Sequence, residues 1–189
     1  SANYNWSPVS GLDNPTTSNP NASPGNSTVY VVEVSDNIGC SDTDSVLVTV
    51  NSLPIVDAGA DQTLCLGQIV QLSASGAITY QWSPSAGLSN PSVFNPTASP
   101  NVPTTYTVEG IDANGCSNTD DVFVDVFVVE AVGANEICRG DSTQLGAIGG
   151  VSWNWVPVAG LSDNTSQNPM ASPYNTTVYV VLADDGNGC

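Results

Sequence analysis

The sequence predicts an all-β protein organised as a tandem array of small β-sandwich domains. Short runs in which apolar and polar residues alternate are bounded by Gly, Pro, Asn or Asp, which is typical of strands joined by tight turns. No sustained 3.6-residue periodicity is present, so helices are not expected. The chain also repeats itself: YNWSPVSGL at 4–12 returns as YQWSPSAGL at 80–88 and as WNWVPVAGL at 153–161. Repetition at a fixed period indicates an array of like domains.

Offsets of 76 and then 73 residues divide the chain into three copies. Residues 51–126 form a complete middle copy. Residues 1–50, the first copy, match its C-terminal part. Residues 127–189, the third copy, match all of it except its last strand. We therefore expect the 189 residues to be a window on a longer filament.

The elements are clearest in the middle copy. Alternation predicts strands at 70–75, 80–83, 105–109 and 122–126, and the Asp-Ala-Asn-Gly run at 112–115 predicts a turn before the last strand. Four or more short strands within about 75 residues suit a two-sheet sandwich. A domain of this size buries only about 60–65% of its unfolded surface, so its core is small.

Large aromatic residues recur at the same strand positions, among the residues expected to face inward. A fixed position on the inner face indicates a packing role. The predicted core residues are Trp6, Trp82, Trp155, Tyr30, Tyr106 and Tyr179.

The charge balance excludes several classes of partner. Arg139 is the single basic residue against 18 acidic ones, no histidine occurs, and the formal net charge is −17. Nucleic acids and anionic lipids are bound through Lys and Arg, so neither is an expected partner. About 40% of the residues are apolar, which argues against disorder. No apolar run approaches the roughly 20 residues needed to cross a bilayer, so no membrane insertion is expected in this segment.

Several motifs of the middle copy carry a resemblance to a known family. They are Trp82-Ser83-Pro84, Asn95-Pro96-Thr97, Thr104–Val108, Asp112–Cys116, the segment Val56–Cys65, and a terminal Val-x-Val-x-Val strand. With these motifs the chain resembles the PKD-like, immunoglobulin-like repeats of giant Bacteroidota cell-surface adhesins, including gliding-motility adhesins exported by the type IX secretion system. It departs from ordinary PKD domains where Trp-Ser-Pro-x-x-Gly-Leu replaces the WDFGDG core.

The resemblance implies immunoglobulin-like (PKD-like) sandwiches in a secreted filament attached to the outer membrane. We expect a structural or adhesive stalk segment, whose partners are its neighbouring repeats and an unknown surface or glycan ligand at a distant tip. Linked weak contacts raise the effective concentration at a surface without a strong single site. The alternative is a spacer or carbohydrate-binding repeat of a large secreted hydrolase.

Catalysis is not expected. Without histidine, His-based triads and metal sites are ruled out, and the cysteines recur with the fold as structural residues do. Adjacent carboxylates such as Asp120 and Asp121 point to opposite faces of a strand and do not converge.

Calcium is the candidate cofactor of an acidic chain without histidine, because it prefers oxygen ligands. The candidate ligands are Asp57, Asp61, Asp112, Asp120 and Asp121. No Asp-x-Asp-x-Asp-Gly loop occurs, and the preference of Asp for tight turns explains the same residues. The expected state is without a cofactor.

Two further surface functions are open. Exposed tryptophans would form a platform that binds sugars, although the recurrence of Trp82 at an inward-facing position better supports its burial in the core. Asp44-Ser45-Val46 and Asp141-Ser142-Thr143 resemble the short acceptor for O-glycans on exported Bacteroidota proteins, which makes Ser45 and Ser142 candidate O-glycan sites.

Five cysteines in an exported chain indicate disulfides. One scheme closes each domain, with Cys65 bonded to Cys116 and Cys138 to Cys189. The favoured scheme bonds Cys65 to Cys189 between neighbouring domains, and leaves Cys116 and Cys138 to cysteines beyond the window. Cys65 is expected at one end of the middle sandwich and Cys116 at the other. Six or seven strand residues span about 20 Å, whereas bonded Cα atoms lie within about 7 Å.

Overall fold

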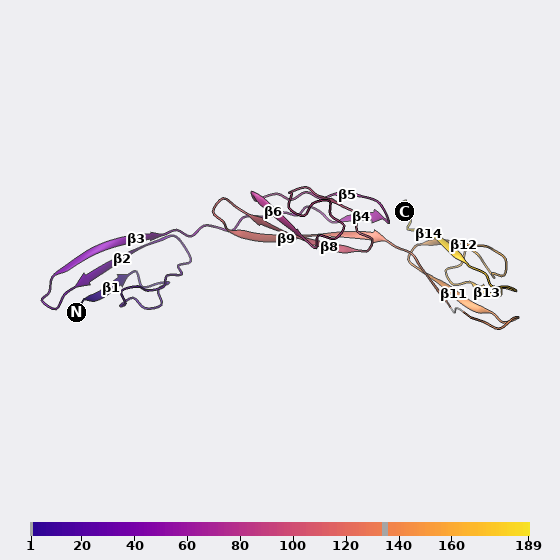
Figure 1. Cartoon of the computed structure of the whole chain (residues 1–189), viewed down its shortest axis with the longest axis horizontal. Helices are drawn as coiled ribbons and strands as arrows, with labels where there is room; N and C mark the ends of the chain where they lie inside the picture. Colours follow the sequence, from indigo (N-terminus) through magenta and orange to yellow (C-terminus); the bar gives the residue numbers. More distant parts are fainter. Residues whose placement is uncertain (1, 134–135) are drawn as a thin grey trace. The chain divides into compact units, whose positions relative to one another are not determined.

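The computed structural model describes residues 2–133 and 136–189 (Figure 1). The chain is all-β, built of immunoglobulin-like sandwich elements as the sequence predicts, and no helix occurs among the described residues. No described segment is therefore a helix long and apolar enough to cross a membrane. Two compact units are present. One extends to Leu53 and includes Asn114–Cys116, and the other consists of Pro54–Ala113 and Ser117–Cys189.

The first copy forms one antiparallel sheet in the order β1-β2-β3. Its strands are β1 (Asn3–Ser7), β2 (Thr28–Ser35) and β3 (Ser41–Val48). Alternation places Trp6 and Tyr30 on one face, where Tyr30 is 1% exposed. Val29 and Leu47 lie on the other face and are exposed.

The middle copy forms a four-stranded sheet and a two-stranded sheet. Its strands are β4 (Gln62–Cys65), β5 (Val70–Gln71), β6 (Thr79–Ser83), β7 (Thr97–Ala98), β8 (Thr104–Ile111) and β9 (Ser117–Phe127). The larger sheet has the order β4-β9-β8-β6, and β5 pairs with β7. β9 is antiparallel to β8, whereas β4 runs parallel to β9 with Gln62 opposite Val124.

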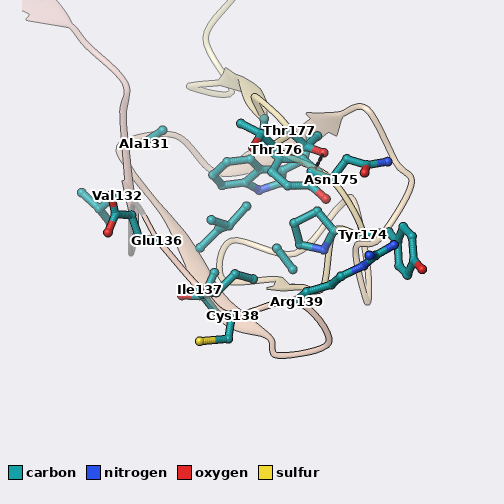
Figure 2. A pocket seen from close by; sticks show the side chains of 17 residues that line it. Ala131, Val132, Glu136, Ile137, Cys138, Arg139, Tyr174, Asn175, Thr176 and Thr177 are labelled. Carbon is teal, nitrogen blue, oxygen red and sulfur yellow. Dashed lines mark hydrogen bonds between the residues drawn. The ribbon is translucent and has the colours of Figure 1, made fainter.

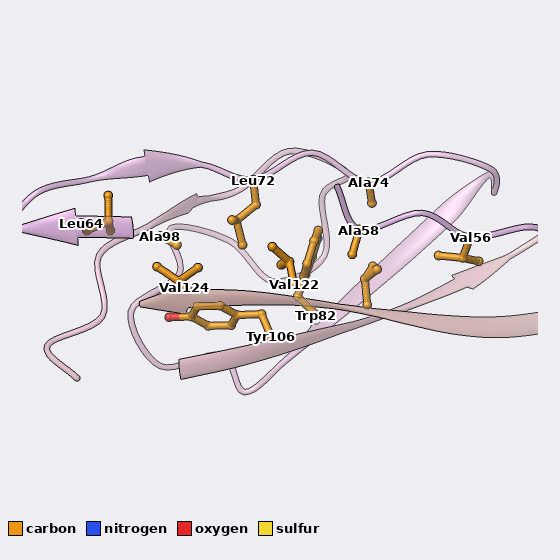
Figure 3. Close-up of a cluster of buried hydrophobic side chains, with 11 residues drawn as sticks. Val56, Ala58, Leu64, Leu72, Ala74, Trp82, Ala98, Tyr106, Val122 and Val124 are labelled. Atoms are coloured by element: carbon orange, nitrogen blue, oxygen red, sulfur yellow. The ribbon is translucent and has the colours of Figure 1, made fainter. Parts of the chain in front are cut away.

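The core of the middle copy lies between these two sheets (Figure 3). Val122 and Val124 of β9 pack with Trp82, Tyr106 and Leu72, and each of these side chains is at most 2% exposed. The pattern follows from the period of two along β9, which turns every second side chain inward. Asp121, Phe123 and Asp125 occupy the alternate positions and are exposed.

By the 73-residue offset the third copy has counterparts of β5, β6, β7 and β8 and an added first strand, and its described residues include no counterpart of β4 or β9. It contains β10 (Glu130–Gly133), β11 (Thr143–Ile148), β12 (Ser152–Val156), β13 (Met170–Ala171) and β14 (Val180–Asp184). Its sheets have the orders β10-β11-β13 and β12-β14. By register β14 corresponds to β8, but its only neighbour among the described residues is β12.

The predicted strands at 80–83, 105–109 and 122–126 are confirmed as β6, β8 and β9, and the turn at 112–115 is also present. The strand predicted at 70–75 is regular only at β5. Backbone hydrogen bonds to the neighbouring segment continue beyond β5. The Leu72 N–H donates to the Pro96 carbonyl at 2.9 Å, and the Ala74 N–H donates to the Phe94 carbonyl at 2.7 Å. Pro96 cannot donate in return, which limits the ladder.

Two residues predicted in the core are only half-buried, namely Trp6 and Tyr179. Trp82, Trp155, Tyr30 and Tyr106 are buried as expected. The difference has a physical reason. The described first copy contains no residues equivalent to Leu64 and Leu72, and no described strand of the third copy takes the place of β9 beside Tyr179.

Candidate functional site

A disulfide joins Cys65 of the middle copy to Cys189 of the third copy. The two Cα atoms are 5.2 Å apart, although 124 residues separate the cysteines in sequence. This is the bond of the inter-domain scheme. The intra-domain bonds Cys65–Cys116 and Cys138–Cys189 therefore do not form. Cys65 and Cys116 lie at the two ends of β9, which keeps them apart. Cys116 precedes Ser117, the first residue of β9, and Cys65 pairs with Phe127, its last residue.

Cys65 is held at the end of β4. It pairs with Phe127 in the parallel ladder with β9, and its N–H donates to the Gln68 side chain at 3.1 Å. The Gln68 N–H in turn donates to the Cys65 carbonyl at 3.0 Å, which closes a turn at Leu66-Gly67. The sulfur is thus presented from a hydrogen-bonded strand end.

Cys189 is held by a turn that the Asp185 carboxylate organises. Asp185 Oδ1 accepts from the N–H groups of Cys189 at 2.9 Å and Asn187 at 2.8 Å. The hydrogen bond from Cys189, followed by that from Asn187, lowers the pKa of Asp185 from its usual 3.8. In the first copy Asp36 accepts from Cys40 and Ile38 in the same way. The turn is therefore a repeated device that fixes a cysteine.

The repeated aromatic residues use their polar atoms inside each copy. Indole Nε1–H groups donate across a separation of 11 residues, from Trp6 to Thr17, Trp82 to Val93 and Trp155 to Ser166. Trp82 and Trp155 are each 1% exposed. Neither indole face is available for stacking on a sugar, because each ring lies in the core. Trp6 and Trp153 are half-buried.

The candidate calcium ligands do not lie close enough together to share one ion. No group of three or more metal-ligating side chains occurs in residues 2–133 and 136–189. Three of the carboxylates hold backbone N–H groups at 2.8 Å: Asp57 accepts from Gly59, Asp61 from Phe123 and Asp120 from Ala58. Asp112 lies in the last turn, and Asp121 points away from the core on β9. The bonds of Asp61 and Asp120 tie the start of the copy to its last strand.

The glycan candidates are accessible. Ser45 lies on β3 and Ser142 follows the turn at Arg139-Gly140, and both are exposed. Arg139 lies with its guanidinium carbon 3.8 Å from the centre of the Tyr174 ring, a cation–π contact.

Sequence patterns did not reveal a groove in the third copy, about 780 Å³ in volume (Figure 2). The residues that line it include Ile137, Arg139, Leu145, Trp155 and Tyr174. The available signal was the absence of a counterpart of residues 117–126 after Cys189. That signal does not show whether the remaining strands close over the core.

No protein-family model and no curated protein sequence matches the chain. Among solved structures it is similar to the human desmocollin-1 ectodomain, at 13% identity and a TM-score of 0.43 over 100% of this chain and 49% of that one. It is similar to the N-terminal eight immunoglobulin domains of Down syndrome cell adhesion molecule, at 12% identity and a TM-score of 0.38 over 95% of this chain and 36% of that one. It is also similar to the insect immune protein hemolin, at 10% identity and a TM-score of 0.36 over 90% of this chain and 60% of that one.

The chain thus spans about half or less of the first two structures and less than two thirds of the third. At these identities and TM-scores the similarities assign neither a family nor a function.

Proposed function

We propose that the chain is a tension-bearing segment of an extracellular adhesive filament, in which residues 1–50, 51–126 and 127–189 belong to three successive domains. The observation that carries the proposal is the Cys65–Cys189 disulfide, which links the middle copy to the third. A bond between copies adds nothing to a binding pocket. It does constrain the chain that connects them.

The bond gives the segment a mechanical property. When the chain is pulled from its two ends, tension passes from Cys65 through the disulfide to Cys189 and does not reach residues 66–188. The third sandwich and the part of the middle sandwich that follows Cys65 are shielded from unfolding under load, whereas β4 lies outside the loop and is not. A filament that transmits force between a cell and a surface requires this property, whereas a tether for an enzyme does not.

The remaining parts of the proposal come from repetition and charge. Cys138 occupies the position of Cys65 and is exposed, so it is placed to bond a further copy in the same way. A net charge of −17 keeps neighbouring filaments apart. From the sequence resemblance we infer export through a type IX system to the bacterial outer surface, a role in adhesion or gliding, and O-glycans at Ser45 and Ser142.

Single-molecule stretching tests the mechanical role. With handles at both ends, the fully unfolded oxidised chain is expected to reach a contour length of about 220 Å, from residues 1–65, and the reduced chain one of about 650 Å, at roughly 3.3–3.6 Å per residue. Cys65→Ser is the matched control and is expected to behave as the reduced chain under all conditions. Equal extension of the oxidised chain and this variant would refute the proposal.

Adhesion is tested separately with chains joined in tandem. Retention of beads on a surface is expected to rise steeply with the number of joined chains, because linkage raises effective concentration. Tight binding of one chain to a polysaccharide would instead favour the carbohydrate-binding repeat of a hydrolase.

A further inference from the structure

A tight turn at residues 138–141 of the third copy places opposite charges on the two sides of a glycine. Its sequence is Cys138-Arg139-Gly140-Asp141, and the Asp141 N–H donates to the Cys138 carbonyl at 3.0 Å. Gly140 has φ +96°, which fits the third position of a type II turn. Apart from its chain neighbours, no described heavy atom lies within 4 Å of a Cβ added at Gly140. The turn therefore projects into open space, and Arg139 and Asp141 are both exposed.

The equivalent turn of the middle copy lacks both charges. There Leu66-Gly67-Gln68 replaces the charged tripeptide, and Gly67 has φ +85°. The hydrogen bond that closes this turn is also 3.0 Å long. Leu66 is 59% exposed and Gln68 is exposed, although Cys65 is bonded to the following copy. The position thus stays accessible at a junction between copies, and the third copy uses it to present two charges.

The Asp141 carboxylate makes no hydrogen bond within the described part of the chain. Asp36 and Asp185, which lie in other turns, each accept backbone N–H groups there. Both carboxylate oxygens of Asp141 are thus available as ligands for a hard cation. A divalent cation takes about six or more oxygen ligands, so this one carboxylate does not hold it alone and the partner has to supply it.

The Arg139 side chain is held in place without losing its hydrogen-bond donors. Its guanidinium carbon lies 3.8 Å from the centre of the Tyr174 ring (Figure 2). Such a contact uses the flat face of the guanidinium and leaves the N–H groups at its edge free for an acceptor. Tyr174 takes the place of Asn101 in the middle copy, so this contact has no counterpart there.

Charge restricts where an acidic partner can approach. Arg139 is the single Lys or Arg of a chain whose formal net charge is −17. Acidic groups of a partner are repelled over the rest of the surface and attracted at this turn. Asp141, on the other side of Gly140, attracts a cation instead. The turn therefore fits a partner that carries an acidic pocket and a cation side by side.

We propose that Arg139-Gly140-Asp141 is a receptor-binding site, recognised by an extracellular protein that holds a divalent cation, with one coordination position open, beside an acidic pocket. The Asp141 carboxylate fills the open position, and the Arg139 guanidinium forms a bidentate pair with a carboxylate of the pocket. Tyr174 is a positioning residue that orients Arg139. The inference rests on the extracellular location in the proposed function, but not on the disulfide.

The probe is the purified ectodomain of an integrin, a receptor that holds Mg²⁺ with a coordination position open to a ligand carboxylate. It is passed over the immobilised, oxidised 189-residue chain, prepared without O-glycans because Ser142 adjoins Asp141. Binding is expected in Mg²⁺ or Mn²⁺ and is expected to be lost in EDTA, because the cation bridges the two proteins. Absence of binding in Mg²⁺ would overturn the proposal. Binding that persists in EDTA would also overturn it, in favour of plain ion pairing.

Asp141→Asn tests the carboxylate. The affinity is expected to fall at least about tenfold, because the substitution removes the charge that the cation attracts. Asp125→Asn is the matched control, since Asp125 is also exposed and the net charge changes equally. It is expected to bind as the wild type does. Neither side chain is buried, so both variants are expected to fold. Equal affinities of the two variants would remove Asp141 from the site and overturn the proposal.

Substitutions at Arg139 and Tyr174 separate charge from position. Arg139→Lys keeps the charge but loses the bidentate geometry, so weaker binding is expected. Tyr174→Asn is expected to weaken binding as well, whereas Tyr174→Phe keeps the cation–π contact and is expected to bind as the wild type does. Affinities equal to wild type for both Arg139→Lys and Tyr174→Asn would contradict the proposed recognition of an oriented guanidinium.

The variants of this turn all keep the Cys65–Cys189 bond, so the stretching experiment is independent of them. A chain that does not bind the integrin but keeps the short oxidised contour would overturn the receptor site alone. Equal extension of the oxidised chain and Cys65→Ser, with integrin binding intact, would overturn the tension-bearing role and support the receptor site.

Discussion

The hydroxyl of Tyr106 donates a hydrogen bond to the carbonyl oxygen of Ala86, 2.9 Å away. The same bond joins Tyr30 to Ser10 at 2.7 Å and Tyr179 to Ala159 at 2.8 Å, always across 20 residues. Tyr30 and Tyr106 thereby tie β2 and β8 to the loop that follows the repeated tryptophan, and Tyr179, the residue that precedes β14, makes the same link. The bond is present even where Tyr179 is half-buried, so its geometry is local to each copy.

Tyr106→Phe removes this bond while it keeps the ring. We expect the free energy of unfolding to fall by about 1–3 kcal/mol, because the Ala86 carbonyl loses its donor near a buried ring. Chemical denaturation monitored by fluorescence measures the change. Tyr174→Phe is the control, since Tyr174 is 71% exposed, and it is expected to be close to neutral.

Gly87→Ala is expected to disturb the same bond from the other side. Gly87 has φ +79°, and an added Cβ would lie 2.9 Å from the Tyr106 hydroxyl oxygen. The left-handed backbone and the steric contact both oppose alanine. Gly67→Ala is the matched control, with φ +85° and no heavy atom within 4 Å of the added Cβ. A lower melting temperature for Gly87→Ala than for Gly67→Ala isolates the contact, and equal values would contradict it.

Trp82→Ala is expected to lower the free energy of unfolding of the middle copy by about 3–5 kcal/mol. The substitution leaves a large cavity in a small core and removes the hydrogen-bond donor of the Val93 carbonyl. The first copy belongs to the other compact unit and is expected to keep its own transition in calorimetry. Trp6→Ala is the comparison, and its smaller effect follows from the half-buried position of Trp6. A near-neutral Trp82→Ala would place the indole outside the core.

Trypsin provides a direct test of the disulfide. Cleavage after Arg139 produces fragments 1–139 and 140–189, which the Cys65–Cys189 bond is expected to hold together. A non-reducing gel is then expected to show one band and a reducing gel two. With Cys65→Ser the fragments are expected to separate on both gels. Separation of the wild-type fragments without reductant would exclude the bond.

Acid is expected to loosen the turn that holds Cys189. The folded pKa of Asp185 lies below its usual 3.8, so the carboxylate contributes stability that is present above that value and lost as the pH falls through the folded pKa. Thermal melting from pH 7 to pH 2 measures the effect. Asp185→Ala is expected to be less stable than wild type at pH 7, with a difference that shrinks below pH 3.8. A constant difference at every pH would show that the charge has no role.

Much of the fold is local, and the sequence by itself determined that part. Alternation predicts β6, β8 and β9, and recurrence at fixed offsets identifies Trp82 and Tyr106 as core residues. These predictions succeed because a strand of period two buries one face wherever it packs. The short strands β4 and β7 were not predicted, since two to four residues are too few to show a period.

Tertiary structure decided what depends on partners distant in sequence. It selected Cys189 as the partner of Cys65. From the sequence alone this pairing is favoured, but a bond from Cys65 to Cys116 remains an alternative. It assigned Asp61 and Asp120 to backbone N–H groups across the sandwich. It also left Tyr179 half-buried and its groove open, because burial of a side chain requires a neighbouring strand as well as a residue that favours the core.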